Sequence, residues 1–91
     1  MRAAVEISMN PLVGDYIPPI QGFIDRLNTY AELKVLTNTL STQIWGELDR
    51  VMAILAEEMQ RSATSGPQLI FVMKVLPKLA APATESSPAA R

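Results

Sequence analysis

Groups able to bind a small molecule fall at two separate places in a chain that is otherwise rich in apolar residues. The segment 37–47, TNTLSTQIWGE, carries hydroxyl and amide side chains and the only tryptophan, Trp45. The segment 5–9, VEISM, places Glu6 and Ser8 between apolar residues. Hydroxyls, amides and a carboxylate can hydrogen-bond a polar ligand, and an aromatic ring can cover an apolar surface of it. Both segments therefore merit attention as parts of one candidate site.

The composition removes most familiar catalytic chemistry. With no cysteine and no histidine, the chain lacks disulfides, thiolate nucleophiles, the usual general base and the commonest metal ligands. Glu6 or Asp15 could still act as a carboxylate base, but no second catalytic group is recognisable beside either. We therefore expect a protein that is not an enzyme and that needs no cofactor.

Length and charge limit the partners. Ninety-one residues form at most one domain, whose core is small enough that a partner subunit would help to stabilise it. A formal net charge of −1, without a basic run, gives no excess of cations for nucleic acid. The first residues do not have the long uninterrupted apolar core that is typical of a signal peptide, and no apolar run reaches the roughly 20 residues of a membrane span. The sequence favours a cytoplasmic protein without nucleic-acid or membrane partners.

The spacing of apolar residues predicts six elements and a tail. Alternation indicates strands and a repeat of three to four residues indicates helices. The turn of the hairpin should fall at 38–41, and Pro18-Pro19 suits the first turn of a helix. The expected order is strand 3–9, helix from 17, strands 33–38 and 40–45, helix 47–65 and strand 68–76, followed by a flexible tail.

This order, βαββαβ, is that of a ferredoxin-like α+β sandwich. Such a fold has an antiparallel four-stranded sheet with two helices on one face. We assign it to residues 1–76 as a ligand-binding domain and leave 77–91, which are rich in Pro, Ala and Ser, as the tail. Strand 68–76 is apolar at nearly every position, which predicts burial on both faces.

Alternation along the first strand sets Glu6 apart from its neighbours. Val5 and Ile7 should face the helices, so Glu6 should face the uncovered side of the sheet. Three roles are open for its carboxylate: an ion pair with Lys74 on a neighbouring strand or with another subunit, a contact to a ligand, or plain exposure to solvent. The carboxylate can form the ion pair when no ligand is bound and contact the ligand when it is bound.

The sequence of the third predicted strand leaves open which of its two faces packs against the helices. Alternation separates Thr42 and Ile44 from Ser41, Gln43 and Trp45, but it does not decide which set faces the helices. Hydroxyl and amide side chains here can cap the hairpin's own backbone instead of meeting a ligand. Trp45 suits the core of an oligomer as well as the side of a ligand site.

Two further sets of residues have plain structural interpretations. The long flexible methionines are expected in the core, where thioethers fill irregular gaps. Acidic residues of the second helix are expected on a solvated face. The methionines are Met9, Met52, Met59 and Met73, and the acidic residues are Asp49, Glu57 and Glu58.

Three segments resemble a known family. VEISMNPLVGDYIPPIQGFI, LSTQIWGELDRVMAIL and LIFVMKVL occur in the order and spacing of the thiamine-binding protein family of YkoF-like ferredoxin-fold domains. The resemblance covers residues 3–76. Its most specific parts are Glu6-Ile-Ser8 followed by Pro11-Leu12, and Ser41 to Gly46 followed by the acidic start of a helix.

The resemblance implies a non-catalytic domain that binds thiamine or its hydroxymethylpyrimidine part as sensor, buffer or carrier. A structural oligomeric domain that binds another small metabolite, or none, is the alternative. Thiamine needs hydrogen-bonding partners at its aminopyrimidine edge, an apolar or aromatic surface, and negative charge near its thiazolium cation. The residues of suitable type are Glu6, Ser8, Asn38, Thr39, Ser41, Thr42, Gln43 and Trp45.

Two further expectations follow. Glu47 and Asp49 crowd the start of the second helix with negative charge, so unphosphorylated thiamine should be preferred over its diphosphate. Ile70 and Val72 should lie on the sheet face that the helices leave open, where exposure would promote association. We therefore expect a homodimer or homotetramer assembled through sheet faces.

Overall fold

The computed structural model of the chain describes residues 1–12, 17–38, 41–66 and 68–79. Its elements follow the predicted βαββαβ order. Thr39 and Leu40 of the predicted turn, and all of the predicted tail beyond Leu79, lie outside the described residues. The elements are β1 (Arg2–Pro11), α1 (Ile17–Leu27), β2 (Lys34–Thr37), β3 (Thr42–Glu47), α2 (Leu48–Ser65) and β4 (Leu69–Pro77).

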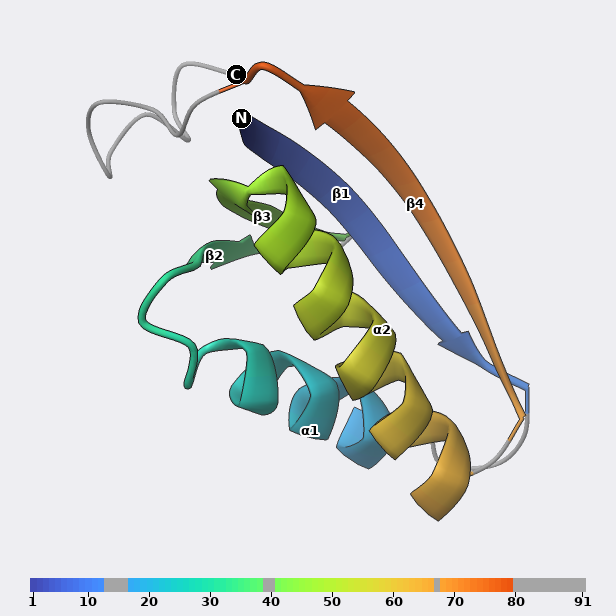
Figure 1. Cartoon of the computed structure of the whole chain (residues 1–91). Coiled ribbons are helices and arrows are strands. Elements are labelled where there is room, and N and C mark those ends of the chain that lie inside the picture. Colours follow the sequence, from blue (N-terminus) through green and yellow to red (C-terminus); the bar gives the residue numbers. More distant parts are fainter. Residues whose placement is uncertain (13–16, 39–40, 67, 80–91) are drawn as a thin grey trace.

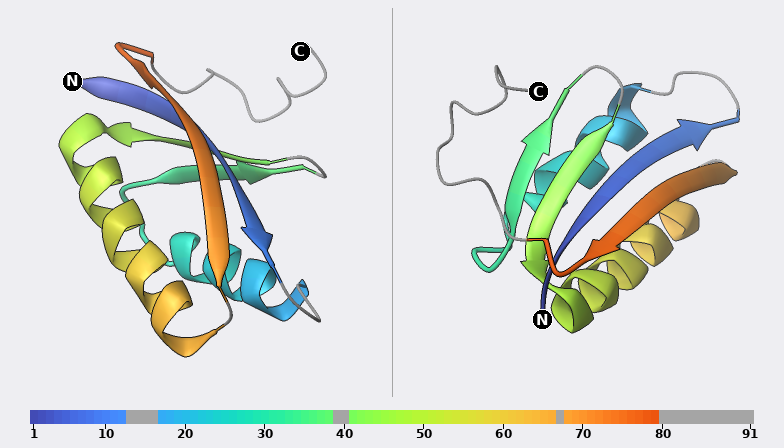
Figure 2. Two further views of the ribbon diagram at one scale, coloured as in Figure 1. Left: turned by 90° about the vertical axis from the view of Figure 1, so that its right-hand side faces the viewer. Right: turned by 90° about the horizontal axis from the view of Figure 1, so that it is seen from above.

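The four strands form one antiparallel sheet in the order β2-β3-β1-β4. Both helices lie on the same side of this sheet (Figure 1), and no helix of the described residues covers the opposite side (Figure 2). This arrangement confirms the predicted ferredoxin-like α+β fold. No helix within the described ranges is long and apolar enough to cross a bilayer.

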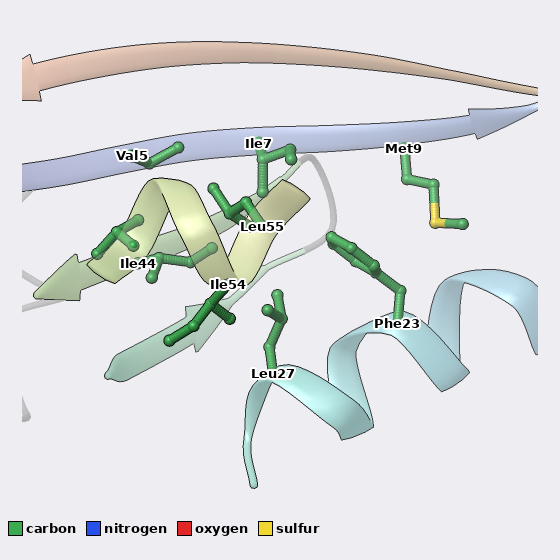
Figure 3. Packing of buried hydrophobic residues seen from close by; sticks show 9 residues of the cluster. Val5, Ile7, Met9, Phe23, Leu27, Ile44, Ile54 and Leu55 are labelled. Carbon is green, nitrogen blue, oxygen red and sulfur yellow. The ribbon is translucent and has the colours of Figure 1, made fainter. Parts of the chain in front are cut away.

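The hydrophobic core lies between the sheet and the two helices. Alternate residues of β1 point into it, so Val5 and Ile7 are almost fully buried. They pack with side chains of α1, β3 and α2 (Figure 3). Burial of each large apolar side chain stabilises the fold by about 1.5–3 kcal/mol. The buried cluster is Val5, Ile7, Met9, Phe23, Leu27, Ile44, Val51, Ile54 and Leu55.

Local sequence explains where the helices begin. α1 starts at Ile17, so Pro18 and Pro19 occupy its first turn, where their missing amide protons cost nothing. α2 follows β3 directly after Gly46 and Glu47. A Cβ at position 46 would lie 2.9 Å from Cγ2 of Val51, so only glycine lets the strand and helix approach this closely.

β4 differs from the expectation of burial on both faces. It forms an edge of the sheet, and the helices do not cover its full width. On the open face Val72 is 56% exposed, and on the helix side Met73 and Val75 are each 37% exposed. The expectation was wrong for the single chain because a strand at the edge has a neighbour on one side only. Met73 is likewise not a core residue, whereas Met9 is buried, and Met52 and Met59 pack against the core.

Candidate functional site

The open face of the sheet brings Glu6 to the middle of three strands. In the register, Glu6 of β1 lies opposite Gln43 of β3 on one side and opposite Lys74 of β4 on the other. Val5 and Ile7 are in the core, so period-2 alternation turns Glu6 away from the helices. This confirms the predicted orientation of the Glu6 side chain.

The Glu6 carboxylate has one close partner and one distant partner. The Ser41 hydroxyl donates to Oε2 at 3.1 Å. Nζ of Lys74 stands 3.9 Å from Oε1, at the limit of an ion pair. The Glu6 side chain is 41% exposed and that of Lys74 is 78% exposed, so solvent weakens this pair to well under 1 kcal/mol. A carboxylate oxygen accepts more than one hydrogen bond, so Glu6 retains acceptor capacity for a ligand.

A hollow of about 300 Å³ opens beside this carboxylate. Polar side chains come from β1 and from the residue before β3, and β4 adds the apolar side chain of Val72 and the charged side chain of Lys74 on the open face. The volume lies at the lower limit of typical small-molecule sites. The residues that line the hollow are Glu6, Ser8, Ser41, Val72, Met73 and Lys74.

Asn38, another predicted site residue, is not among the residues that line the hollow. The side chain of Asn38 accepts a hydrogen bond from the Ser41 amide at 2.9 Å, and the Asn38 amide donates to the Ser41 carbonyl. Asn38 therefore caps the hairpin backbone, which was the plain structural interpretation. Thr39 lies outside the described residues.

The structure decides the direction of β3. Thr42 and Ile44 face the helices, because they lie opposite Ile7 and Val5. Thr42 is 5% exposed and its hydroxyl is 3.2 Å from that of Thr37. Gln43 lies on the open face beside Glu6 without lining the hollow.

Trp45 also belongs to the open face but is only 7% exposed. It lies opposite Ala4 on β1 and Lys34 on β2. Glu6 is two residues further along β1, so Trp45 is displaced from the hollow by one position on that face. The hollow therefore has an apolar side from Val72 of β4, and the indole is not part of it.

The structure contains a second polar cluster, which the sequence analysis missed. Glu58 was expected on a solvated face, but its side chain is 3% exposed. It accepts a hydrogen bond from Arg26 and one from the Tyr30 hydroxyl at 2.7 Å. Arg26 also donates to the Ser62 hydroxyl at 2.6 Å. The expectation was wrong because the two helices pack along this face of α2.

The pKa of Glu58 reflects these partners. Burial raises the pKa of the carboxyl, but hydrogen bonds from Tyr30 and Arg26, and the charges of Arg26 and Arg61, outweigh burial and hold it below its ordinary value. The same hydrogen bond raises the pKa of Tyr30. The spacing of Val51, Leu55, Glu58 and Ser62, four, three and four residues apart, is the signal that places Glu58 on the buried stripe of α2.

The chemistry available on the open face is hydrogen bonding and charge balance. Within the described ranges, no group of three or more carboxylate, histidine or cysteine side chains could hold a metal ion. The site that remains is a half-exposed carboxylate with two serine hydroxyls beside an apolar strand. The fold and this site together define a ferredoxin-like α+β domain with a polar hollow on its open sheet face.

Solved structures share this fold. Protein SP2199 of Streptococcus pneumoniae has a TM-score of 0.78 at 22% identity, with all of both chains covered. TM0486 of Thermotoga maritima, whose name gives thiamine biosynthesis or salvage as its suggested role, has a TM-score of 0.82 at 17% identity, again over both whole chains. A domain of unknown function, DUF77, from Bacillus cereus has a TM-score of 0.71 at 16% identity and covers 99% of this chain and 90% of its own. No protein-family model and no curated protein matches the chain.

Proposed function

We propose that this chain is a member of the thiamine-binding YkoF-like group and binds thiamine, or its hydroxymethylpyrimidine part, without catalysis. It would act in the cytoplasm as a sensor, buffer or carrier and form a homo-oligomer through its open sheet faces. The suggested role of TM0486, which has the same fold, supports the proposal. The observation that carries it is the Glu6 carboxylate, half exposed in a hollow with serine hydroxyls.

The groups around the hollow match the chemistry of thiamine. The thiazolium ring is permanently cationic, so it would lie near the Glu6 carboxylate. There it would take the place of Lys74 as the charge partner of Glu6. The hydroxyls of Ser8 and Ser41 can donate to or accept from the aminopyrimidine edge. Val72 offers an apolar surface for a ring face.

The preference for unphosphorylated thiamine needs another basis than the one in the sequence. Glu47 ends β3, six residues beyond Ser41, which corresponds to roughly 20 Å along a strand. Its carboxylate binds the N-terminal ammonium at 2.9 Å and Arg2 at 3.3 Å. Repulsion of a diphosphate would therefore come from Glu6, and the preference remains a prediction.

Calorimetric titration with thiamine, hydroxymethylpyrimidine and thiamine diphosphate tests the proposal. Glu6→Gln should weaken thiamine binding about tenfold or more, because it removes the charge that balances the thiazolium. Ser41→Ala should weaken both thiamine and the free pyrimidine. Glu32→Gln is the matched control, since Glu32 is a similarly exposed carboxylate, 44%, that pairs with Arg50.

Two results would contradict the proposal in different ways. No heat from any of the three ligands, with the protein shown to be folded, would favour the alternative of a structural oligomeric domain. Binding that survives both Glu6→Gln and Ser41→Ala would keep the function and remove this site. The exposed apolar side chains of β4 are the observation that favours the structural alternative.

A further inference from the structure

Trp45 is far more buried than its place in the sheet explains. It lies on the open face, which no helix of the described residues covers (Figure 2), and yet it is only 7% exposed. Glu6 is the natural comparison, because it lies one position further along the same face, on a strand that also has a neighbour on each side. The Glu6 side chain is 41% exposed. Flanking strands alone therefore leave a side chain of this face in contact with solvent.

The cross-strand neighbours of Trp45 do not account for its burial. Ala4 on β1 is too short to reach over an indole, and the stem of Lys34 on β2 is too narrow to cover both rings. Leu76, which completes this row on β4, is itself 45% exposed. Side chains on a sheet stand roughly perpendicular to it and cover one another's flanks. The outer surface of the indole is therefore covered by a segment that lies across the face.

The last described residues bring the chain to this end of the sheet. The Lys78 amide donates to the Arg2 carbonyl at 2.8 Å, one position beyond the pair of Pro77 and Ala3. Lys78 then adopts a φ of 69°, in the left-handed region that residues other than glycine enter mainly at turns. Figures 1 and 2 show the chain bending there from β4 toward the start of β1. The chain beyond Leu79 is thus directed across the sheet instead of along β4.

We propose that residues 80–83, Ala-Ala-Pro-Ala, lie over Trp45 and form a strap across the open face. Trp45 lies two strand spacings from β4 and three positions back from Leu79, which amounts to about 14 Å. An extended chain advances about 3.3 Å per residue. About four residues beyond Leu79 therefore reach the indole.

The chemistry of residues 80–83 suits an indole surface. The segment has no charged side chain that would lose its hydration there. Pro82 has no amide proton, so it leaves no donor unpaired against an apolar ring. Proline-containing extended segments commonly dock on aromatic side chains. A second copy is not required to cover Trp45, because the exposure of 7% belongs to the single chain.

The strap divides the open face into two parts. It covers the row of Trp45 and Ala4 and leaves the row of Glu6 open to a ligand. A second copy that packs on this face would meet the rows of Glu6 and Ser8. The inference does not rest on the proposed function, since the burial of Trp45 carries it in the absence of any ligand.

NMR of the full chain tests the placement directly, because protons held over an indole are shifted upfield by its ring current. The methyl protons of the alanines and the ring protons of Pro82 within 80–83 should be shifted upfield and should show NOEs to the Trp45 ring. Pro88 is the internal reference, a proline further along the chain whose shifts should be ordinary. In Trp45→Leu, the shifts of residues 80–83 should be lost.

A matched pair of substitutions tests whether the strap is what excludes water. Ala81→Asp would place a carboxylate against the indole and should release the strap, whereas Ala89→Asp, the same change further along the chain, should leave it in place. Relaxation of the Trp45 ring protons by a soluble paramagnetic probe should rise severalfold in Ala81→Asp and stay as in the wild type in Ala89→Asp. Both substitutions lie outside the hydrophobic core, so both proteins should fold.

Three outcomes overturn the inference. The first is ordinary shifts for residues 80–83 in the folded wild-type protein. The second is equal relaxation of the Trp45 ring protons in Ala81→Asp and Ala89→Asp. The third is protection of Trp45 that disappears on dilution, which would show that a second copy covers the indole.

Discussion

Two carboxylates, Glu58 and Glu6, meet similar partners in opposite surroundings. Each has a cationic side chain and a hydroxyl nearby. Glu58 lies between the helices, 3% exposed, and hydrogen bonds from Arg26 and Tyr30 reach its two oxygens. Glu6 lies on the open face, 41% exposed, with a serine hydroxyl at 3.1 Å and a lysine at 3.9 Å.

The difference shows how burial separates a structural charge from a binding one. A buried carboxylate is tolerated only when partners replace the water it has lost, so the geometry of Glu58 leaves no room for a ligand. A half-exposed carboxylate keeps part of its hydration and can exchange water or a weak partner for a ligand. Glu58 therefore holds α1 to α2, and Glu6 is the group available for recognition.

The largest expected effect comes from removing the cation of the buried pair. Arg26→Met keeps much of the apolar stem but leaves Glu58 without its main charge partner, so the free energy of unfolding should fall by about 3 kcal/mol. Lys74→Met, the same kind of change beside Glu6, should alter it by less than about 0.5 kcal/mol. Denaturant unfolding measures both, and equal losses would show that the two pairs are energetically alike.

Acid should affect the buried carboxylate next. The pKa of Glu58 in the folded protein lies below its ordinary value of 4.5, so its contribution to stability is present above that value and is lost as the pH falls through the lower, folded pKa. The wild-type protein should therefore lose more stability than Glu58→Gln between about pH 6 and about pH 3. If the free energy of unfolding fell equally with pH in the two proteins, Glu58 would not be a source of acid sensitivity.

Tyr30→Phe should have a smaller effect on the same cluster. It removes one hydrogen bond to Glu58 and leaves the ring packed, so the loss should be about 1 kcal/mol. It should also raise the pKa of Glu58, because that bond favours the ionised form. Thermal unfolding at two pH values measures both consequences. If the loss of stability at acid pH were the same as in the wild-type protein, the expected rise in the pKa of Glu58 would be contradicted.

The smallest expected change in stability is at Glu6 itself. Glu6→Gln should change the free energy of unfolding by less than about 0.5 kcal/mol, since its partners are exposed. The same variant should nevertheless lose thiamine affinity, as proposed above. A loss of stability close to that of Arg26→Met would show that Glu6 is a structural residue.

The sequence predicted the fold well because its signals are local. Alternation through Val5, Glu6 and Ile7 set the first strand and the outward direction of Glu6. Pro18-Pro19 set the start of α1. Each of these depends on a few neighbouring residues, and the topology follows from the order of the elements.

What the sequence did not predict depends on contacts between elements. Glu58 was placed in solvent, because its burial requires knowledge of where α1 crosses α2. The exposure of Val72 and Met73 depends on the position of β4 at the edge, which an apolar pattern alone does not reveal. The direction of Thr42 required the pairing register with β1.

Trp45 provides an optical reporter that requires no label. It is the only tryptophan in the chain, and its side chain is removed from water on a sheet strand, 7% exposed. Its fluorescence should shift to longer wavelength when the sheet unfolds, and no second indole contributes to the signal. Emission from this single residue therefore follows the integrity of β3 and its neighbours at concentrations too low for association.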